Sequence, residues 1–308
     1  MFAVELNILK EKKLELKEFA KDVASRINAF MESYINKFDD DAPELKESMR
    51  YGLLLGGKRA RPLLVYATGL ALGQSKEKLD YAAAAIECVH AYSLIHDDMP
   101  EMDNDKLRRG HATVHVKFSQ TVALLAGDAL QTLAFEIVSD KKSGLSDRAV
   151  AKLTRLLSTK AGYSGMCGGQ AIDLASEGKH LSFDELRLLH SKKTGALIRA
   201  AVLMGAACAD NATDAQIEKL DEYAKWTGLA FQVWDDILDV IGDTAVMGKT
   251  QGSDISLDKS TYPALLGIDK AKEFAHECAQ KAIASLKDLA IDTSLLEQFA
   301  LFAVNRDH

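Results

Sequence analysis

Two clusters of aspartate are the residues of this chain whose types and spacing most clearly suggest chemistry. Each cluster begins with an Asp–Asp pair and ends a long apolar stretch. Their members are Asp97, Asp98 and Asp103 in the first cluster, and Asp235, Asp236 and Asp239 in the second. Carboxylates gathered in this way repel one another unless a cation lies between them. Because no matching set of cysteines or histidines accompanies them, these hard oxygen ligands favour Mg²⁺ over zinc.

The spacing inside the two clusters differs. Asp235 and Asp239 lie about 40° apart on one face of a helix, because they are four residues apart. Asp97 and Asp103 are six residues apart, about 240° on an ideal helix, so they cannot share a face there. Pro100 disfavours helix at the residue before it, and we expect the chain to fold Asp103 back toward Asp97. One such cluster could equally be a solvated acidic patch, but two of them favour a metal site.

Basic residues accompany both clusters. They are Lys58, Arg59 and Arg61 in GGKRARP, Arg108 and Arg109 after the first cluster, and Lys193, Lys249 and Lys259 further along. Any one of them alone is an ordinary surface base. Together with the aspartates they predict a cavity for multiply charged anions, in which one diphosphate is held through Mg²⁺ and another directly by Lys and Arg.

The elements that must position these residues are helices. Apolar residues recur at spacings of three and four almost throughout, which predicts an all-α protein of roughly ten helices in a single domain, 1–308. The stretches 78–98 and 217–241 are expected to be central and buried. Capping-box patterns at Ser182 and Thr213 each predict the start of a helix. No alternation suggests a sheet, and the glycine-rich segment 242–260 is expected to be a functional loop.

Composition excludes several classes of function. The net charge of −7 gives no basic field for nucleic acid, so no nucleic-acid partner is expected. The four cysteines have no CxxC spacing and are interpreted as buried free thiols in a reducing compartment. We expect neither a signal peptide nor a membrane span, which predicts a cytoplasmic protein.

The motifs together resemble the class I trans-isoprenyl diphosphate synthases, most specifically their bacterial farnesyl diphosphate synthase branch. The resemblance runs over nearly the whole chain, through GGKRARP, HDDMPEMDNDKLRRG, LAGDAL, GGQAIDL, KKTGALI, FQVWDDILD, GKTQGSD and KSTYP. It implies an isoprenoid synthase fold, all-α around a central cavity, and a homodimer. It also implies a Mg²⁺-dependent prenyltransferase that condenses isopentenyl diphosphate head-to-tail with dimethylallyl or geranyl diphosphate, giving farnesyl diphosphate.

The resemblance also implies a role for individual residues. The positions similar to ligands of three Mg²⁺ (or Mn²⁺) on the allylic diphosphate are Asp97, Asp103 and Asp235, with Asp98 and Asp239 supporting. Those similar to direct contacts of that diphosphate are Arg108, Lys193 and Lys249. The isopentenyl diphosphate site is implied at Lys58, Arg61, His90 and Arg109. Polar groups facing the developing allylic cation are implied at Thr194 and Gln232, the latter also counted with the allylic diphosphate site.

Product length depends on the residues before the first cluster. Tyr92 and Ser93 lie five and four residues before Asp97, so Tyr92 should face the same cavity one turn below the metal site. A ring there would close the pocket, and an aromatic residue at this position resembles farnesyl (C15) synthases. The alternatives are that Tyr92 is an ordinary core residue and that the product is C20 or C10.

Two other functions share parts of this pattern. A class I terpene cyclase would normally lack GGKRARP and carry an Asn/Ser/Glu motif in place of the second aspartate cluster. A non-catalytic regulatory subunit of a synthase would tend to lose the first cluster, which is intact here. Ala112 departs from the proline usual in this family, which leaves the local loop geometry open but touches no expected ligand.

Overall fold

The computed structural model describes residues 2–241 and 260–306, with side chains from residue 15 onward. Lys249, Lys259 and most of the glycine-rich segment lie outside these residues. The longer helices are α1 (Phe2–Ile35), α2 (Pro43–Leu54), α3 (Ala60–Ala71), α4 (Lys76–Asp97), α6 (Gln120–Ser139), α7 (Asp147–Ala161), α8 (Met166–Ala175), α9 (Phe183–Lys193), α10 (Gly195–Ala207), α11 (Asp214–Ile241), α15 (Ile268–Ser285) and α16 (Ser294–Ala303). Shorter helices are α5 (Val114–Lys117), η1 (Lys141–Ser143) and α14 (Tyr262–Leu266). The prediction of an all-α fold is therefore confirmed.

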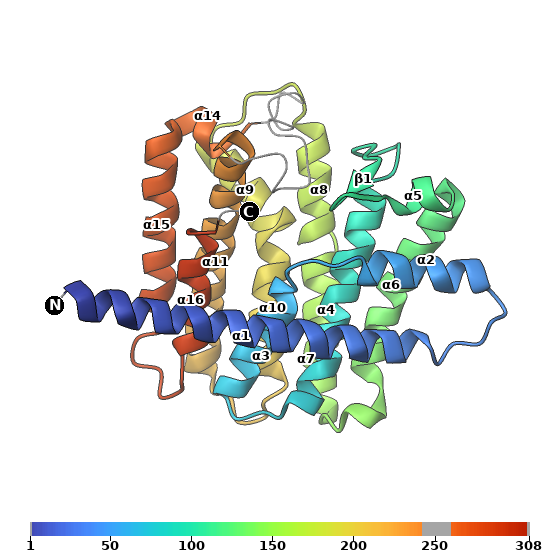
Figure 1. Cartoon of the computed structure of the whole chain (residues 1–308), viewed down its shortest axis with the longest axis horizontal. Coiled ribbons are helices and arrows are strands. Elements are labelled where there is room, and N and C mark those ends of the chain that lie inside the picture. Colours follow the sequence, from blue (N-terminus) through green and yellow to red (C-terminus); the bar gives the residue numbers. More distant parts are fainter. Residues whose placement is uncertain (1, 242–259, 307–308) are drawn as a thin grey trace.

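Helix α4 is the centre of the larger part of the core. Most of its residues are buried, as its apolar composition predicts, and it packs against α3, α6 and α10. Helix α1 lies across the bundle on the side facing the viewer in Figure 1, nearly perpendicular to most other helices. The C-terminal end of α4, which carries the first aspartate cluster, therefore emerges from a rigid and well-packed element.

Helix α11 organises the second part of the core. It packs against α10, α15 and α9, and its last turns carry the second aspartate cluster. A separate apolar cluster joins these helices, including Val233, Ile237 and Tyr262, all fully buried. The second group of aspartates thus starts from a helix that is fixed on several sides.

Local signals in the sequence are largely confirmed. Ser182 accepts from the Glu185 amide while the Glu185 side chain accepts from the Ser182 amide, which completes the capping box. Thr213 and Gln216 exchange the same pair of hydrogen bonds, at 2.9 and 3.2 Å. Two details differ from expectation: a hairpin of two-residue strands, β1 (Leu107–Arg108) and β2 (His111–Ala112), forms after the first cluster, and Cys167 is exposed. Two-residue strands are too short to leave an alternating pattern in a sequence.

One helix of the described part is long and apolar enough to cross a membrane by length and composition. It is α6, whose most apolar window has a mean hydropathy of 1.4 and is 44% buried within the protein. It contains Asp128 and Glu136, which is why the sequence alone predicts no span there. Because α6 packs along α4 and also contacts α2, it occupies the position of a core helix.

Candidate active site

A cavity of about 370 Å³ lies between the C-terminal half of α4 and helices α8 and α10. Seven residues singled out from the sequence line it: Arg61, His90, Tyr92, Ser93, Asp97, Lys193 and Thr194. Apolar side chains make up much of the remainder: Leu94, Met102, Met166, Leu174 and Leu197. The cavity therefore combines charged groups with an apolar interior, as a ligand with a charged head and a hydrocarbon tail requires.

The first aspartate cluster folds as expected. Helix α4 ends at Asp97, and the backbone N–H of Asp103 donates to the backbone oxygen of Asp97 at 2.8 Å, which brings the two residues together. Burial raises the pKa of Asp97 to about 6, with the nearby Asp103 carboxylate adding to the effect and the Lys193 ammonium opposing it. Negative charge at this position is thus incompletely compensated by the protein's own bases.

Asp98 and Arg108, which the sequence gives separate roles, are partners of each other. The Arg108 Nε lies 2.9 and 2.8 Å from the two Asp98 oxygens, and its Nη2 lies 2.6 Å from one of them. Asp98 is only 3% exposed. A buried carboxylate gripped by a guanidinium fixes both groups, so Asp98 holds Arg108 beside the first cluster.

The second cluster divides between two faces of α11. Asp235 and Asp239 are partly exposed, whereas Asp236 between them is 2% exposed. Asp235 forms an ion pair with Arg306, whose guanidinium Nη2 lies 2.7 Å away and is itself nearly buried. The sequence does not suggest Arg306 as a site residue, because nothing in its local pattern links the C-terminal end of the chain to α11.

The motif GGKRARP supplies one buried base, which has a structural partner, and two bases that solvent or the cavity can reach. Arg59 is buried and pairs with Glu87 of α4 at 2.6 Å, so it holds the motif in place. Lys58 is exposed and Arg61 lines the cavity. Gly57 has φ +121°, and a Cβ there would lie 2.6 Å from the Arg109 guanidinium. A glycine is therefore required for Arg109 to reach its hydrogen bond with the backbone oxygen of Gly56.

Electrostatics connect these bases with the second cluster. Neighbouring protein atoms that displace water from the Lys58 ammonium, together with the Arg306 guanidinium, lower the pKa of Lys58 to about 8, while Asp235 opposes them. Burial and the Arg61 guanidinium hold the pKa of His90 well below its usual value, so His90 is neutral near pH 7. Arg109 acts electrostatically on Lys58, Arg61 and His90, so the four residues that the resemblance places at an isopentenyl diphosphate site lie close together.

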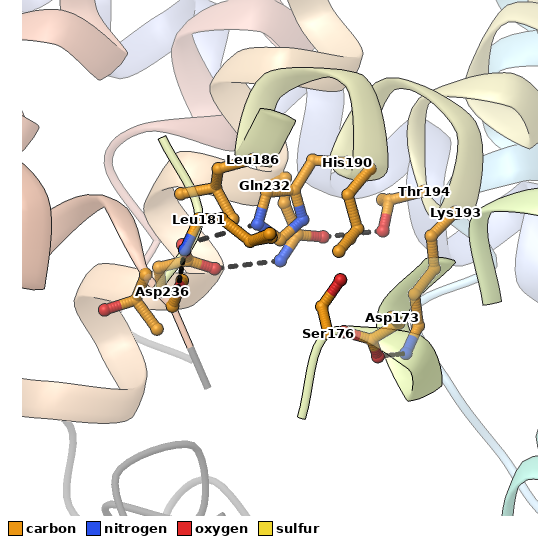
Figure 2. A pocket seen from close by; sticks show the side chains of 12 residues that line it. Asp173, Ser176, Leu181, Leu186, His190, Lys193, Thr194, Gln232 and Asp236 are labelled. Carbon is orange, nitrogen blue, oxygen red and sulfur yellow. Dashed lines mark hydrogen bonds and ion pairs between the residues drawn. The ribbon is translucent and has the colours of Figure 1, made fainter. Parts of the chain in front are cut away.

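A smaller cavity of about 90 Å³ adjoins the larger one, and Lys193 and Thr194 line both. Figure 2 shows its lining side chains, with Lys193 directed toward Asp173 and Thr194 toward Gln232. The Lys193 ammonium lies 2.5 Å from the Asp173 carboxylate, and the Thr194 hydroxyl donates to the Gln232 amide oxygen at 2.6 Å. Thr194 and Gln232, predicted together, are therefore in direct contact.

Two residues of the stretch GGQAIDL were not assigned a role from the sequence. Asp173 holds Lys193, and Gln170 lines the larger cavity with neither amide atom hydrogen-bonded within the described structure. The motif itself was the only signal for them. Such a buried amide costs free energy unless water or a ligand satisfies it.

The carboxylates fit a hard dication shared with a ligand. No three His, Cys, Asp or Glu side chains within residues 15–241 and 260–306 form a complete metal-binding group. Mg²⁺ in proteins is typically held by one or two carboxylates together with phosphate oxygens and water. The raised pKa of Asp97 and the all-oxygen donor set agree with that type of site.

Comparison with known proteins gives a consistent result. Residues 42–293 match the polyprenyl synthetase family. The chain is 50% identical to the farnesyl diphosphate synthase of Haemophilus influenzae over 94% of this chain and 98% of that protein. It is 56% identical to the Escherichia coli enzyme of the same name, over 85% and 89%.

Solved structures agree in fold. An FPP/GFPP synthase from Zymomonas mobilis, in its apo form, has a TM-score of 0.84 and 37% identity, covering 95% of this chain and 99% of that one. A Helicobacter pylori geranyltransferase complexed with magnesium and isoprenyl diphosphate has a TM-score of 0.81 and 34% identity, covering 93% and 95%. With a family match over most of its length and close relatives along nearly all of it, this chain belongs to the polyprenyl synthetase family.

Proposed function

We propose that this protein is a Mg²⁺-dependent trans-prenyltransferase that condenses isopentenyl diphosphate with dimethylallyl or geranyl diphosphate to give farnesyl diphosphate. The observation that carries the proposal is the cavity beside Asp97, which bases, a carboxylate and aliphatic side chains line together. Relatives that are 50% and 56% identical carry the name of this activity.

The two diphosphates would occupy different groups of bases. Lys193 and the Asp98-held Arg108 lie beside the first cluster and would bind the allylic diphosphate directly. Lys58, Arg61, His90 and Arg109 would bind isopentenyl diphosphate, whose double bond then lies toward the allylic carbon. Positive charge aimed at both diphosphates orients the substrates before any bond changes.

The carboxylates Asp97, Asp103 and Asp235, supported by Asp98 and Asp239, would hold Mg²⁺, and three ions per site is the family expectation. When bound, the metal supplies electrophilic stabilisation of the leaving diphosphate. The bases named above stabilise the same charge, so the C–O bond of the allylic ester ionises. The apolar interior excludes water from the resulting cation until the isopentenyl double bond attacks. Proton loss needs no side-chain base, because the departing diphosphate can accept the proton.

Product length follows from the depth of the cavity. The Tyr92 ring is 4% exposed and lines the cavity, with its hydroxyl 3.5 Å from the Cys167 thiol and its ring 5.8 Å from that of His96. A ring braced on two sides would stop a growing chain, which favours C15 over C20. A geranylgeranyl pyrophosphate synthase from Catharanthus roseus is also 43% identical over 80% of this chain, so C20 is the second candidate.

The assay that tests the proposal uses purified protein, Mg²⁺, isopentenyl diphosphate and either allylic starter. Farnesyl diphosphate should be the main product from both starters, and chelation of the metal should abolish turnover. Absence of any condensation would instead favour the regulatory-subunit alternative. Cyclised hydrocarbon from the allylic diphosphate alone would favour a terpene cyclase.

We further propose that the enzyme is a cytoplasmic homodimer that pairs through α6. Leu124 and Leu125 are 47% and 48% exposed on this helix, and Val116 on the adjoining α5 is 48% exposed. Such an apolar patch on a helix that is otherwise part of the core is typical of a subunit interface. The Leu124 backbone oxygen also lies 3.1 Å from His96 Nε2, which would connect the interface with the cavity.

A further inference from the structure

We propose that Asp236 is a positioning residue and not a metal ligand, and that it sets the direction in which the Thr194 hydroxyl donates. This inference rests on the proposed function, because it assigns Asp236 a part in stabilising the allylic cation. The residue belongs to the Asp–Asp pair of the second cluster, yet its surroundings differ from those of its neighbours.

The first step is burial. The Asp236 side chain is 3% exposed, whereas the Asp235 side chain is 40% exposed. Asp236 lies about 100° around the helix from Asp235 and about 60° from Asp239, so it points to the side of the face that those two residues form. Its own face lies over the apolar cluster that contains Val233 and Tyr262.

The second step is that both carboxylate oxygens of Asp236 already accept hydrogen bonds. Asp236 Oδ1 accepts from the Gln232 amide nitrogen at 2.9 Å, and Oδ2 accepts from the backbone N–H of Tyr262 at 3.0 Å. His190 Nε2 lies 3.8 Å from Oδ2, and burial lowers the pKa of His190 to about 4, so the ring is neutral near pH 7. Figure 2 shows Asp236, Gln232 and Thr194 in one line along the smaller cavity. Both oxygens thus already serve the protein's own donors.

The third step is the polarity of the chain of hydrogen bonds. A carboxylate can only accept, so the Gln232 amide must present its nitrogen to Asp236 and its oxygen to Thr194. The Thr194 hydroxyl then donates at 2.6 Å to Gln232, which lines the smaller cavity and is not among the residues lining the larger cavity that Thr194 also lines. The Thr194 hydroxyl proton is therefore used by Gln232. The lone pairs of the Thr194 oxygen remain available to the cavity in which an allylic cation would form.

The test reverses the direction of these hydrogen bonds with substitutions that keep the size of each side chain. In Asp236→Asn the side-chain oxygen can still accept from Tyr262, while the new NH₂ faces Gln232 and turns its amide over. We expect kcat with geranyl and isopentenyl diphosphates to fall roughly ten- to hundredfold, with both KM values changed by less than about threefold. Gln232→Glu alone should also be slow, because it sets two carboxylates against each other.

The double variant Gln232→Glu with Asp236→Asn is the decisive protein. The carboxylate introduced on α11 by Gln232→Glu can accept from both Thr194 and the new amide, which restores the original direction of the Thr194 hydroxyl. The double variant should therefore turn over at least about tenfold faster than Asp236→Asn alone. A double variant no faster than either single variant would overturn the proposal. If Asp236→Asn does not fold, as judged by circular dichroism, Gln232→Met tests the same chain of bonds and should show the same loss in kcat with unchanged KM.

Metal binding gives a readout that does not depend on turnover. Titration of Mn²⁺, followed by electron paramagnetic resonance in the presence of inorganic diphosphate, should be nearly unchanged in Asp236→Asn and strongly weakened in Asp235→Asn. Equal weakening in the two variants would make Asp236 a ligand and overturn the proposal. If the wild-type protein makes no product, the proposed function fails, and this titration still decides whether Asp236 is a ligand.

Discussion

Neighbouring aspartates in this chain have different environments. Asp97 is partly buried with a raised pKa, Asp98 next to it is held by Arg108, and Asp235 and Asp236 differ in exposure and in partner. Helical spacing predicts which of them share a face, and the turn at Pro100 is read correctly from the sequence. Their partners could not be predicted, because Arg306 and Tyr262 reach α11 only through the tertiary fold.

The lowered pKa of Lys58 predicts that substrate binding depends on pH. Its pKa is lowered to about 8, so the ammonium is protonated below that pH and loses its charge as the pH rises through it. We expect kcat/KM for isopentenyl diphosphate to fall as the pH rises through about 8, since a neutral amine attracts a diphosphate poorly. In Lys58→Arg the guanidinium stays charged, and the fall should move to higher pH. Superimposable pH profiles for the two proteins would remove Lys58 from the binding site.

Tyr92 gives a prediction about product length. In Tyr92→Ala the cavity loses the ring that closes it, and C20 should replace C15 as the main product in chromatography of the dephosphorylated prenols. Tyr92→Phe is the matched control: it keeps the ring, loses the hydroxyl that contacts Cys167 and Gln131, and should still give C15. Unchanged product from Tyr92→Ala would mean that another side chain limits growth.

At the scale of elements, buried polar contacts fix the helices that carry the site. Arg59 leads into α3 with φ 49° and reaches Glu87 on α4, Asn28 on α1 and the backbone oxygen of Leu53 on α2. One side chain thus ties three helices to the motif that supplies Lys58 and Arg61. The sequence suggested Arg59 only as one base among several, because its burial depends on helices distant in the chain.

Loss of the Arg59–Glu87 ion pair should destabilise the folded protein. Both side chains of the pair are 3–4% exposed, so Arg59→Met leaves the Glu87 carboxylate buried without its partner. We expect the free energy of unfolding, measured by urea denaturation, to fall by about 3–5 kcal/mol. Adding Glu87→Leu should recover most of that loss. A double variant as unstable as Arg59→Met would show that the contacts to α1 and α2 matter more than the ion pair.

Helix starts were the most predictable feature at this scale. Capping boxes place the first residues of α9 and α11 well, because these signals are local, whereas the break between α9 and α10 left no such signal. The hairpin β1–β2 and the exposure of Cys167 were missed, since both depend on what lies beside them in space. Direct catalytic roles for the site residues stay predictions, although the structure places seven of them around one cavity.

For the whole molecule, the main open prediction is assembly. Leu124→Asp with Leu125→Asp places charges on the exposed face of α6 and should halve the mass measured by light scattering, turning a dimer into a monomer. Leu188→Asp is the control, because Leu188 is equally exposed, at 51%, but lies on α9. A dimer that survives the α6 changes would place the interface elsewhere.

The central claim is that the two aspartate clusters face each other across one metal-bound diphosphate. Anomalous diffraction from crystals soaked with Mn²⁺ and a non-ionisable thio analogue of geranyl diphosphate tests it most directly. The account predicts manganese peaks in contact with carboxylate oxygens of Asp97, Asp103 and Asp235, with the analogue's chain directed toward Tyr92. Manganese and analogue bound together away from both clusters would contradict it.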